Sequence, residues 1–373
     1  MSSISWLPIA SAWENDNSGT IVCGMPGSGK TFFMVNTAAN CICMGQRIVA
    51  IDPKDDFIKL KNIMPEVEVV DINKVKEQRP GALNPFTFLS DCSAINLMTV
   101  IEILLGEVTR EDKSALIPIL TDFMTDYRKY GNYTDLQDLV DYLHSNRNDT
   151  ARIIGQNLRL NQESKYSALL FTRERDVEPL YITPTKSLVI SILGMTMPSP
   201  DKKLNEYNAE ERFSSCVLYL LTSKLREILA SKQVIPTTVF CDEAHSLFAN
   251  DQMEEIISEF LRKGRSLNIA TVLGSQAMSS FPDYIGQYVA SKFIFKSSVD
   301  DAKEFLTRFD VSKMDIEKSI DYNSTIGGIA NLKTGCCFMI DRLGRSGFVQ
   351  IESIWPIELL TSNPLATQNR EEE

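Results

Sequence analysis

Short apolar runs alternate with helical patterns in the first and last parts of the chain. Runs of about five apolar residues between polar or glycine positions predict buried strands. Six such runs fall within residues 19–23, 46–53, 67–72, 187–193, 237–241 and 268–274. Because helical segments separate most of them, they favour a mainly parallel sheet with right-handed crossovers. The fold class that this order predicts is α/β.

Between residues 91 and 175 the pattern becomes helical. Thr134, followed three residues later by Gln137, predicts the N-terminal cap of one helix. Apolar residues recur at the spacing of an amphipathic helix in Leu116, Ile119, Leu120, Phe123 and Met124. We therefore expect an α/β core in two parts, residues 1–90 and 176–373, with an all-helical insertion at residues 91–175.

The last third of the chain predicts an antiparallel hairpin. Two apolar runs, at residues 336–340 and 347–351, flank a polar turn that contains Arg342 and Arg345. We interpret this segment as a surface turn. A contact of either arginine with a neighbouring subunit is the alternative.

A glycine-rich loop follows the first predicted strand. Residues 24–31 read Gly-Met-Pro-Gly-Ser-Gly-Lys-Thr and match the P-loop pattern G-x-x-x-x-G-K-[ST] at every specified position. In a P-loop the backbone N–H groups and the following helix bind phosphates, the lysine reaches the β- and γ-phosphates, and the hydroxyl ligates Mg²⁺. The residues expected to bind the nucleotide are Gly24, Gly27, Ser28, Gly29, Lys30 and Thr31. Thr31 is also expected to bind the metal.

Two acidic residues follow the strand predicted at residues 237–241. Asp242 and Glu243 complete the Walker B form, an apolar strand that ends in Asp-Glu. We expect Asp242 to hold Mg²⁺ and Glu243 to orient and polarise the attacking water. Many strands end in acidic residues, so the Walker B interpretation depends on the P-loop in the same chain. His245 is expected to pack beside the site without a chemical role.

Polar residues around the next predicted strand complete the candidate catalytic group. Gln276 follows that strand, where an amide can sense the γ-phosphate or hold the attacking water. Arg262, Lys263 and Arg265 precede the same strand. One or two of these charges suit the C-terminus of a helix. Arg265 is expected to reach the γ-phosphate of a neighbouring subunit.

Three aspartates, Asp52, Asp55 and Asp56, follow the second predicted strand. Ligands of parallel sheets bind at the carboxyl ends of the strands. A contact of these residues with a ribose or an adjoining subunit is therefore one interpretation. We favour the other, a solvated acidic loop.

Composition narrows the classes of function. The 373 residues carry a net charge of −11, which argues against a surface that coats nucleic acid but leaves a local basic channel open. There are two histidines and eight cysteines without a C-x-x-C pair, so no zinc site is expected and the thiols suit a reducing compartment. No stretch approaches the roughly 18 apolar residues of a membrane-spanning helix, and no signal peptide is expected.

With these motifs in view, the chain resembles the HerA–FtsK superfamily of RecA-like motors. Within it, the chain is most similar to the TraC-type assembly ATPases of conjugative type IV secretion systems. Further features that carry the resemblance are Ala-Leu-Asn-Pro-Phe at residues 82–86, Leu-Leu-Phe at 169–171 and the spacing of Arg265 and Gln276. The resemblance spans residues 19–360. Family members usually carry a large domain before the P-loop, whereas 23 residues precede it here.

The resemblance implies a RecA-like fold and Mg²⁺-dependent ATP hydrolysis in a homo-oligomeric ring, a hexamer, with Arg265 acting in trans. Weak association of the isolated chain is the alternative. It also implies other secretion-system proteins as partners and a cytoplasmic location, with attachment to the inner membrane through those partners.

Three functions remain open at this point. The leading hypothesis is an ATP hydrolase that energises assembly or substrate transfer in a conjugative secretion system. One alternative is a DNA-translocating pump of the coupling-protein or FtsK kind, for which nucleic acid would be a partner; the acidic net charge makes it less favoured. The other is a nucleotide-gated scaffold with little turnover, against which the water-activating Glu243 argues.

Overall fold

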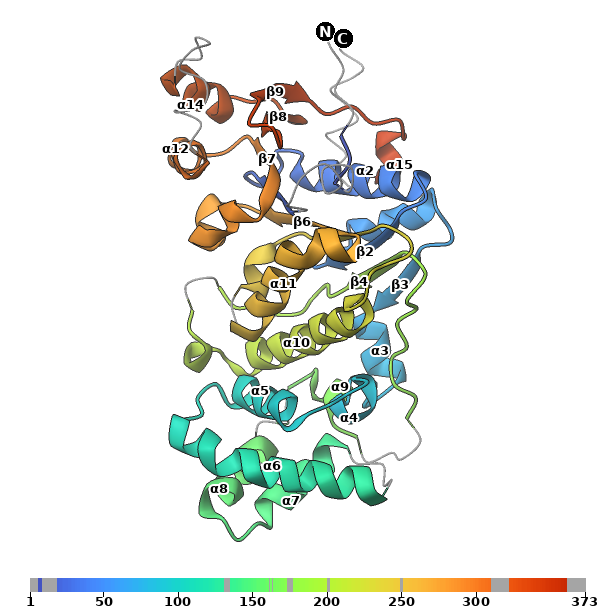
Figure 1. The fold of residues 1–373 in the computed structure, drawn as a ribbon, viewed down its shortest axis with the longest axis vertical. Coiled ribbons are helices and arrows are strands. Elements are labelled where there is room, and N and C mark those ends of the chain that lie inside the picture. Colours follow the sequence, from blue (N-terminus) through green and yellow to red (C-terminus); the bar gives the residue numbers. More distant parts are fainter. Residues whose placement is uncertain are drawn as a thin grey trace.

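A central sheet organises the fold. The computed structural model describes residues 6–8, 19–130, 135–160, 162, 164–172, 177–199, 202–248, 251–309 and 322–360. Within these residues, nine strands form one sheet in the order β3-β4-β2-β5-β6-β1-β7-β8-β9, in the upper half of Figure 1. They are β1 (Gly19–Cys23), β2 (Arg47–Asp52), β3 (Glu68–Asp71), β4 (Leu188–Ser191), β5 (Thr237–Cys241), β6 (Ile269–Ser275), β7 (Val289–Phe295), β8 (Cys336–Ile340) and β9 (Ser346–Gln350).

Strands β1 to β7 are parallel, and β8 and β9 continue the sheet as an antiparallel hairpin. Strand β6 lies between β5 and β1, so Thr271 is opposite both Val239 and Gly19. The prediction of an α/β fold with a mainly parallel sheet and a C-terminal hairpin is confirmed.

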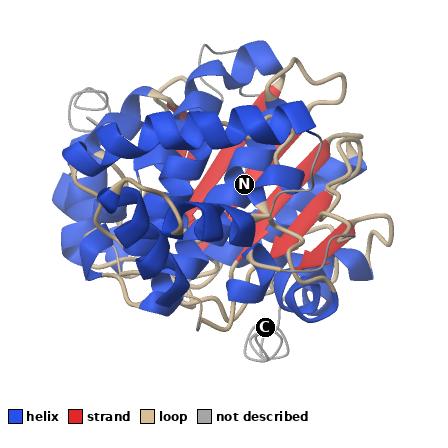
Figure 2. Ribbon diagram, turned by 90° about the horizontal axis from the view of Figure 1, so that it is seen from below, coloured by secondary structure: helices blue, strands red, loops and turns tan. Residues whose placement is uncertain are grey.

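Helices cover both faces of the sheet, as the view in Figure 2 shows. The α-helices are α2 (Lys30–Cys43), α3 (Ile72–Gln78), α4 (Pro85–Phe88), α5 (Ala94–Leu105), α6 (Arg110–Tyr130), α7 (Leu136–His144), α8 (Asp149–Leu160), α9 (Ser167–Leu170), α10 (Ala209–Leu229), α11 (Asp251–Leu267), α12 (Val299–Arg308), α14 (Tyr322–Ala330) and α15 (Ile357–Leu360). Short 3₁₀ helices are η1 (Phe57–Asn62), η2 (Leu204–Glu206), η3 (Ala244–Leu247), η4 (Met278–Ser280) and η5 (Asp283–Gln287).

The two faces of the sheet belong to two apolar cores. Consecutive residues of β1 point to opposite faces, so Ile21 packs with α10, α11 and α12, whereas Val22 packs with α2, η1 and α15. All five residues of β1 are buried. Burial on both faces explains why the parallel strands read as continuous apolar runs in the sequence.

Aromatic side chains fix α2 on the sheet. Phe33 packs against Phe293 and Phe295 of β7, with ring centroids 4.7 and 5.7 Å apart. The ring of Trp6 adds an edge contact 4.7 Å from that of Phe293. Because aromatic rings bury large apolar areas, these contacts hold the start of α2 against strand β7 of the sheet.

The helices α5 to α8 form the lower end of the molecule in Figure 1. Every regular element that the structure describes between residues 94 and 170 is a helix. Helix α5 packs against α10 on one side and α6 on the other. The apolar core continues from the sheet into these helices, because Val239, Leu220 and Leu120 belong to the same buried cluster. The boundaries 91 and 175 remain a prediction.

The predicted cap of α7 is wrong by one residue. Asp135 is the N-cap, and its carboxylate accepts the backbone N–H of Asp138. Aspartate caps helices at least as well as threonine does. Thr134 itself lies outside the described residues.

Among the helices that the structure describes, none combines the length and the hydropathy needed to cross a membrane.

Candidate functional site

Four neighbouring strands end at the same edge of the sheet and supply the candidate site. In the order β2, β5, β6, β1 they are parallel, so their carboxyl ends lie side by side. The P-loop follows β1, Asp242 and Glu243 follow β5, and Gln276 follows β6. The loop after β2 adds Lys54, which we did not predict.

The P-loop has the backbone of a phosphate cradle. Gly27 and Gly29 have φ values of 77° and 100°, which side chains other than glycine rarely tolerate. Helix α2 begins at Lys30 without a side-chain cap, so a bound anion can take that place. The buried Ser28 hydroxyl has no hydrogen-bond partner among the described residues. An uncapped helix start beside an unpartnered buried hydroxyl fits a phosphate group.

Lys30 and Thr31 both contact Asp242. The Nζ atom of Lys30 lies 3.1 Å from Oδ1 of Asp242, and the Thr31 hydroxyl donates a hydrogen bond of 2.7 Å to Oδ2. Lys30 and Asp242 are 6% and 2% exposed. A hydroxyl and a carboxylate that share one position beside a phosphate cradle are the hard oxygen ligands that Mg²⁺ prefers. The two residues therefore fit the predicted metal site.

Gly274 makes room for this contact. A Cβ atom on Gly274 would lie 2.6 Å from Oδ1 of Asp242 and 2.7 Å from the sulfur of Met34. A glycine inside a buried strand signals the close approach of other groups. Gly274 ends the apolar run at residues 268–274 and carries that signal in the sequence, although we predicted no role for it.

Glu243 is the centre of a second group of contacts. Its Oε1 accepts a 2.7 Å hydrogen bond from the Gln276 amide and also forms an ion pair with Lys54. On the other oxygen, Nδ1 of His245 lies 3.5 Å from Oε2. Glu243 has the left-handed backbone conformation, with φ 58° and ψ 47°. This conformation is uncommon in residues other than glycine.

The charge state of Glu243 follows from these neighbours. Burial alone would raise the pKa of Glu243, but the contact with His245, the charge of Lys30 and the hydrogen bonds from Lys54 and Gln276 hold it well below its ordinary value. Glu243 is therefore an anion at neutral pH. His245 lies beside the site, as predicted, and also supports this charge.

The loop after β2 differs from the solvated acidic loop that we expected. Asp52 is 1% exposed, and its carboxylate accepts the backbone N–H groups of Lys54, Asp56 and Phe57 at 3.2, 3.1 and 2.8 Å. Burial raises the pKa of Asp52 to about 6, against the effect of these hydrogen bonds. Asp52 thus folds the loop so that Lys54 extends toward Glu243.

The structure does not bring Arg265 to this site. Arg265 is exposed in the last turn of α11, just before β6 begins. It therefore lies at the amino-end edge of the sheet, opposite the P-loop. Arg345 lies in the turn after β8 and pairs with Asp341 at 2.6 Å, in agreement with a surface turn.

Fold and site together define a P-loop nucleotide-binding protein with a RecA-like core. The AAA-like domain family matches residues 11–362. The chain belongs to this family of P-loop ATPases.

Two solved structures share the fold. VirB4 of Thermoanaerobacter pseudethanolicus superposes with a TM-score of 0.68 at 17% sequence identity, over 93% of this chain and 92% of that chain. The unbound monoclinic form of the bacterial conjugative coupling protein TrwBdeltaN70 gives a TM-score of 0.53 at 14% identity, over 92% and 88%. No curated protein sequence matches the chain. The RecA-like fold that the resemblance implied is confirmed.

Asp52 generates a prediction about stability. Its pKa is about 6 in the folded chain and 3.8 ordinarily, so the folded state favours the protonated acid. Protonated Asp52 therefore adds to the free energy of unfolding. This added stability is fully present below about pH 4 and is lost as the pH rises through 6, a change of up to about 3 kcal/mol. We expect the stability of the wild type relative to Asp52→Asn to fall by that amount between pH 4 and 7. Urea unfolding at several pH values measures it; a pH-independent difference would contradict the raised pKa.

Proposed function

We propose that the chain is an Mg²⁺-dependent ATP hydrolase that powers a conjugative type IV secretion apparatus. The observation that carries the hydrolytic activity is the ionised Glu243, held by Gln276 and Lys54 beside the Lys30–Asp242 pair. A protein that only binds nucleotide has no need for such a carboxylate.

The residues of the site divide the work of phosphoryl transfer. The P-loop backbone and Lys30 bind the phosphates, and the Thr31 hydroxyl and Asp242 hold the metal, whose charge neutralises the phosphate oxygens. When ATP binds, Lys30 exchanges part of its contact with Asp242 for phosphate oxygens. The Ser28 hydroxyl, which has no hydrogen-bond partner among the described residues, would then bond to a phosphate oxygen.

Glu243 orients and polarises the attacking water. Its low pKa makes it a weak base, so its main contribution is a fixed negative charge that aligns the water with the γ-phosphorus. Gln276 and Lys54 both contact Oε1 of Glu243. We assign Lys54 the role of a positioning residue, because it touches the carboxylate and not the P-loop.

We further propose that the site is completed by a second copy of the chain in a ring. Arg265 is exposed at the edge of the sheet opposite its own P-loop, a position that leaves it to act only on the nucleotide of another copy. In this proposal ATP lies between subunits.

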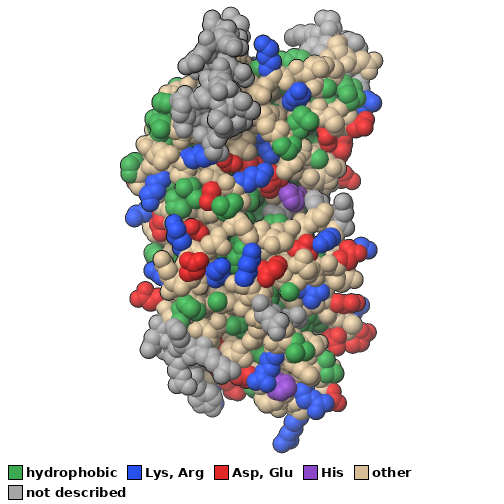
Figure 3. Space-filling view, turned by 180° about the vertical axis from the view of Figure 1, so that it is seen from behind, with side chains coloured by type: hydrophobic (Ala, Val, Ile, Leu, Met, Phe, Trp, Pro, Cys, Tyr) green, Lys and Arg blue, Asp and Glu red, His purple; other side chains and the backbone are tan. Residues whose placement is uncertain are grey.

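The role in secretion rests on the motif resemblance and on fold. VirB4 and this chain superpose over more than nine-tenths of both chains. The similarity to the coupling protein TrwBdeltaN70 keeps a DNA pump as the alternative. On the face in Figure 3, acidic and basic side chains are interspersed along the described surface rather than gathered by sign, which favours protein partners. We place the chain on the cytoplasmic side of the inner membrane, attached through those partners.

The first test replaces the carboxylate. We expect Glu243→Gln to bind ATP as the wild type does but to lower kcat by about 10²- to 10⁴-fold, because the amide lacks the charge that polarises the water. Calorimetry measures binding, and phosphate release measures turnover. Glu259→Gln is the matched control, since Glu259 of α11 pairs with Arg226 of α10 and with Lys263 outside the site. A loss of ATP affinity in Glu243→Gln as large as the loss of kcat would show that Glu243 is structural.

The second test concerns Lys54. We expect Lys54→Met to lower kcat by about 10- to 100-fold with an unchanged KM for ATP, the effect of losing one charged hydrogen bond in the transition state. Lys54→Arg should recover most of the activity. Lys59→Met serves as the control, because Lys59 pairs with Asp56 in the same loop. An unchanged or higher kcat in Lys54→Met would refute the positioning role.

The third test addresses the action of Arg265 in trans. Arg265→Ala should lower turnover by about 10³- to 10⁵-fold, and Arg262→Ala, one turn earlier on α11, should not. Mixing Arg265→Ala with Glu243→Gln protein should restore part of the activity, because some interfaces then combine an intact Glu243 with an intact Arg265. Absence of rescue in mixtures that demonstrably co-assemble would exclude the trans role.

A further inference from the structure

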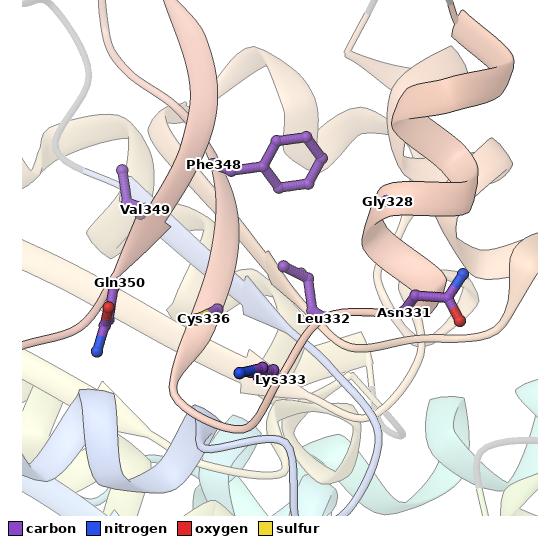
Figure 4. A pocket seen from close by; sticks show the side chains of 8 residues that line it. All are labelled: Gly328, Asn331, Leu332, Lys333, Cys336, Phe348, Val349 and Gln350. Carbon is purple, nitrogen blue, oxygen red and sulfur yellow. The ribbon is translucent and has the colours of Figure 1, made fainter. Parts of the chain in front are cut away.

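A hollow of about 370 Å³ lies between α14 and the β8–β9 hairpin. Figure 4 shows the side chain of Phe348 projecting into the space between the hairpin and the helix, with Lys333 and Gln350 at the other end. The residues that line it are Gly328, Asn331, Leu332, Lys333, Cys336, Phe348, Val349 and Gln350. None of them belongs to the P-loop or to the Glu243 group of contacts.

The turn beside the hollow is bonded to the P-loop. The turn that lines it carries Thr334 and Gly335, and the Thr334 hydroxyl donates a 3.4 Å hydrogen bond to the carbonyl of Gly27. The backbone N–H of Gly335 donates a 3.1 Å bond to the carbonyl of Ser28. The turn that borders the hollow is therefore packed directly against the P-loop.

The hollow lies at the edge of the sheet where the sugar and base of a P-loop nucleotide can lie. Strand β8 starts and β9 ends at the carboxyl edge, where Cys336 pairs with Gln350. This is the same edge as the P-loop, on the side of β1 away from Glu243. Ligands of parallel sheets bind along this edge, so the sugar and base of a nucleotide held by the P-loop can extend toward the hollow.

Phe348 is built as a flat, fixed apolar surface. The ring is 50% exposed, yet Phe338 supports it edge-on with centroids 5.1 Å apart. Gly328 lets α14 approach, because a Cβ atom there would lie 2.6 Å from Cζ of Phe348. An aromatic ring held on one side and open on the other is suited to stacking a planar ligand.

The rest of the lining suits a heteroaromatic ring. Leu332 is apolar like Phe348, whereas the exposed amides of Asn331 and Gln350 can donate to and accept from ring nitrogens and amino groups. The exposed Lys333 carries a positive charge at the end next to the P-loop. Mixed apolar walls with a few polar groups are typical of small-ligand sites of this volume.

We propose that this hollow binds the purine base of the nucleotide, stacked on Phe348. The proposal rests on the proposed function, since the P-loop must hold the phosphates of the same molecule. Stacking on one ring selects purines over pyrimidines through the larger planar surface, and it accounts for an exposed phenylalanine beside a phosphate loop.

The test separates the base from the phosphates. Calorimetry compares ADP with pyrophosphate, which offers the two phosphates without a base. We expect Phe348→Ala to weaken ADP binding by about 10-fold or more, the usual effect of losing one base–aromatic stack, and to leave pyrophosphate binding unchanged. Phe348→Trp should bind ADP as the wild type does, and the wild type should bind ADP more tightly than CDP.

A matched control lies on the same hairpin. Leu343 is 61% exposed in the β8–β9 turn at the opposite edge of the sheet, and Leu343→Ala should change neither affinity. Unchanged ADP affinity in Phe348→Ala overturns the proposal, and a drop in self-association instead would assign Phe348 to contact with a second copy. Loss of pyrophosphate binding in both Phe348→Ala and Phe348→Leu also overturns it, because the residue would then act on the fold. A wild type that binds neither ligand refutes the proposed function itself.

Discussion

The buried ion pair between Lys30 and Asp242 is the contact on which the arrangement of the site depends. Both side chains are withdrawn from water, and removing one leaves the other charge unpaired at a cost of about 3–5 kcal/mol. The pair requires α2 and β5 to approach each other across β6, and Gly274 leaves the space for this. The aromatic contacts of Phe33 hold α2 in place. Strand order, one glycine and the packing of one helix thus place a cation and a carboxylate beside the same P-loop.

Glu243 is adjacent to Asp242 in the chain but belongs to a different set of contacts. Glu243 has a left-handed backbone conformation, which costs about 1–3 kcal/mol in a residue other than glycine. The hydrogen bond from Gln276 and the ion pair with Lys54 offset this cost. Asp242 therefore pairs with Lys30, while Glu243 contacts Gln276 and Lys54.

The P-loop and the Asp242–Glu243 pair could be predicted because their chemistry lies in consecutive residues after an apolar strand. Gln276 could be predicted for the same reason, because it directly follows an apolar strand. Lys54 was not, because its contact with Glu243 depends on β2 lying beside β5, and the order of strands is not written in any local pattern. Asp52 was misjudged because polar loops are usually solvated, although Asp-Pro near a strand end is also a signal for a side chain that bonds its own backbone. The hollow at Phe348 depends on Thr334 meeting Gly27, 307 residues earlier, which only the folded chain shows.

The central claim is that this chain hydrolyses ATP at a site that a second copy completes, without nucleic acid. The most direct measurement is the steady-state rate of phosphate release per chain as a function of chain concentration, with and without single- and double-stranded DNA. The account predicts turnover per chain that rises with concentration as interfaces form and that is indifferent to DNA. Turnover that is independent of concentration, or that depends on DNA, would contradict it.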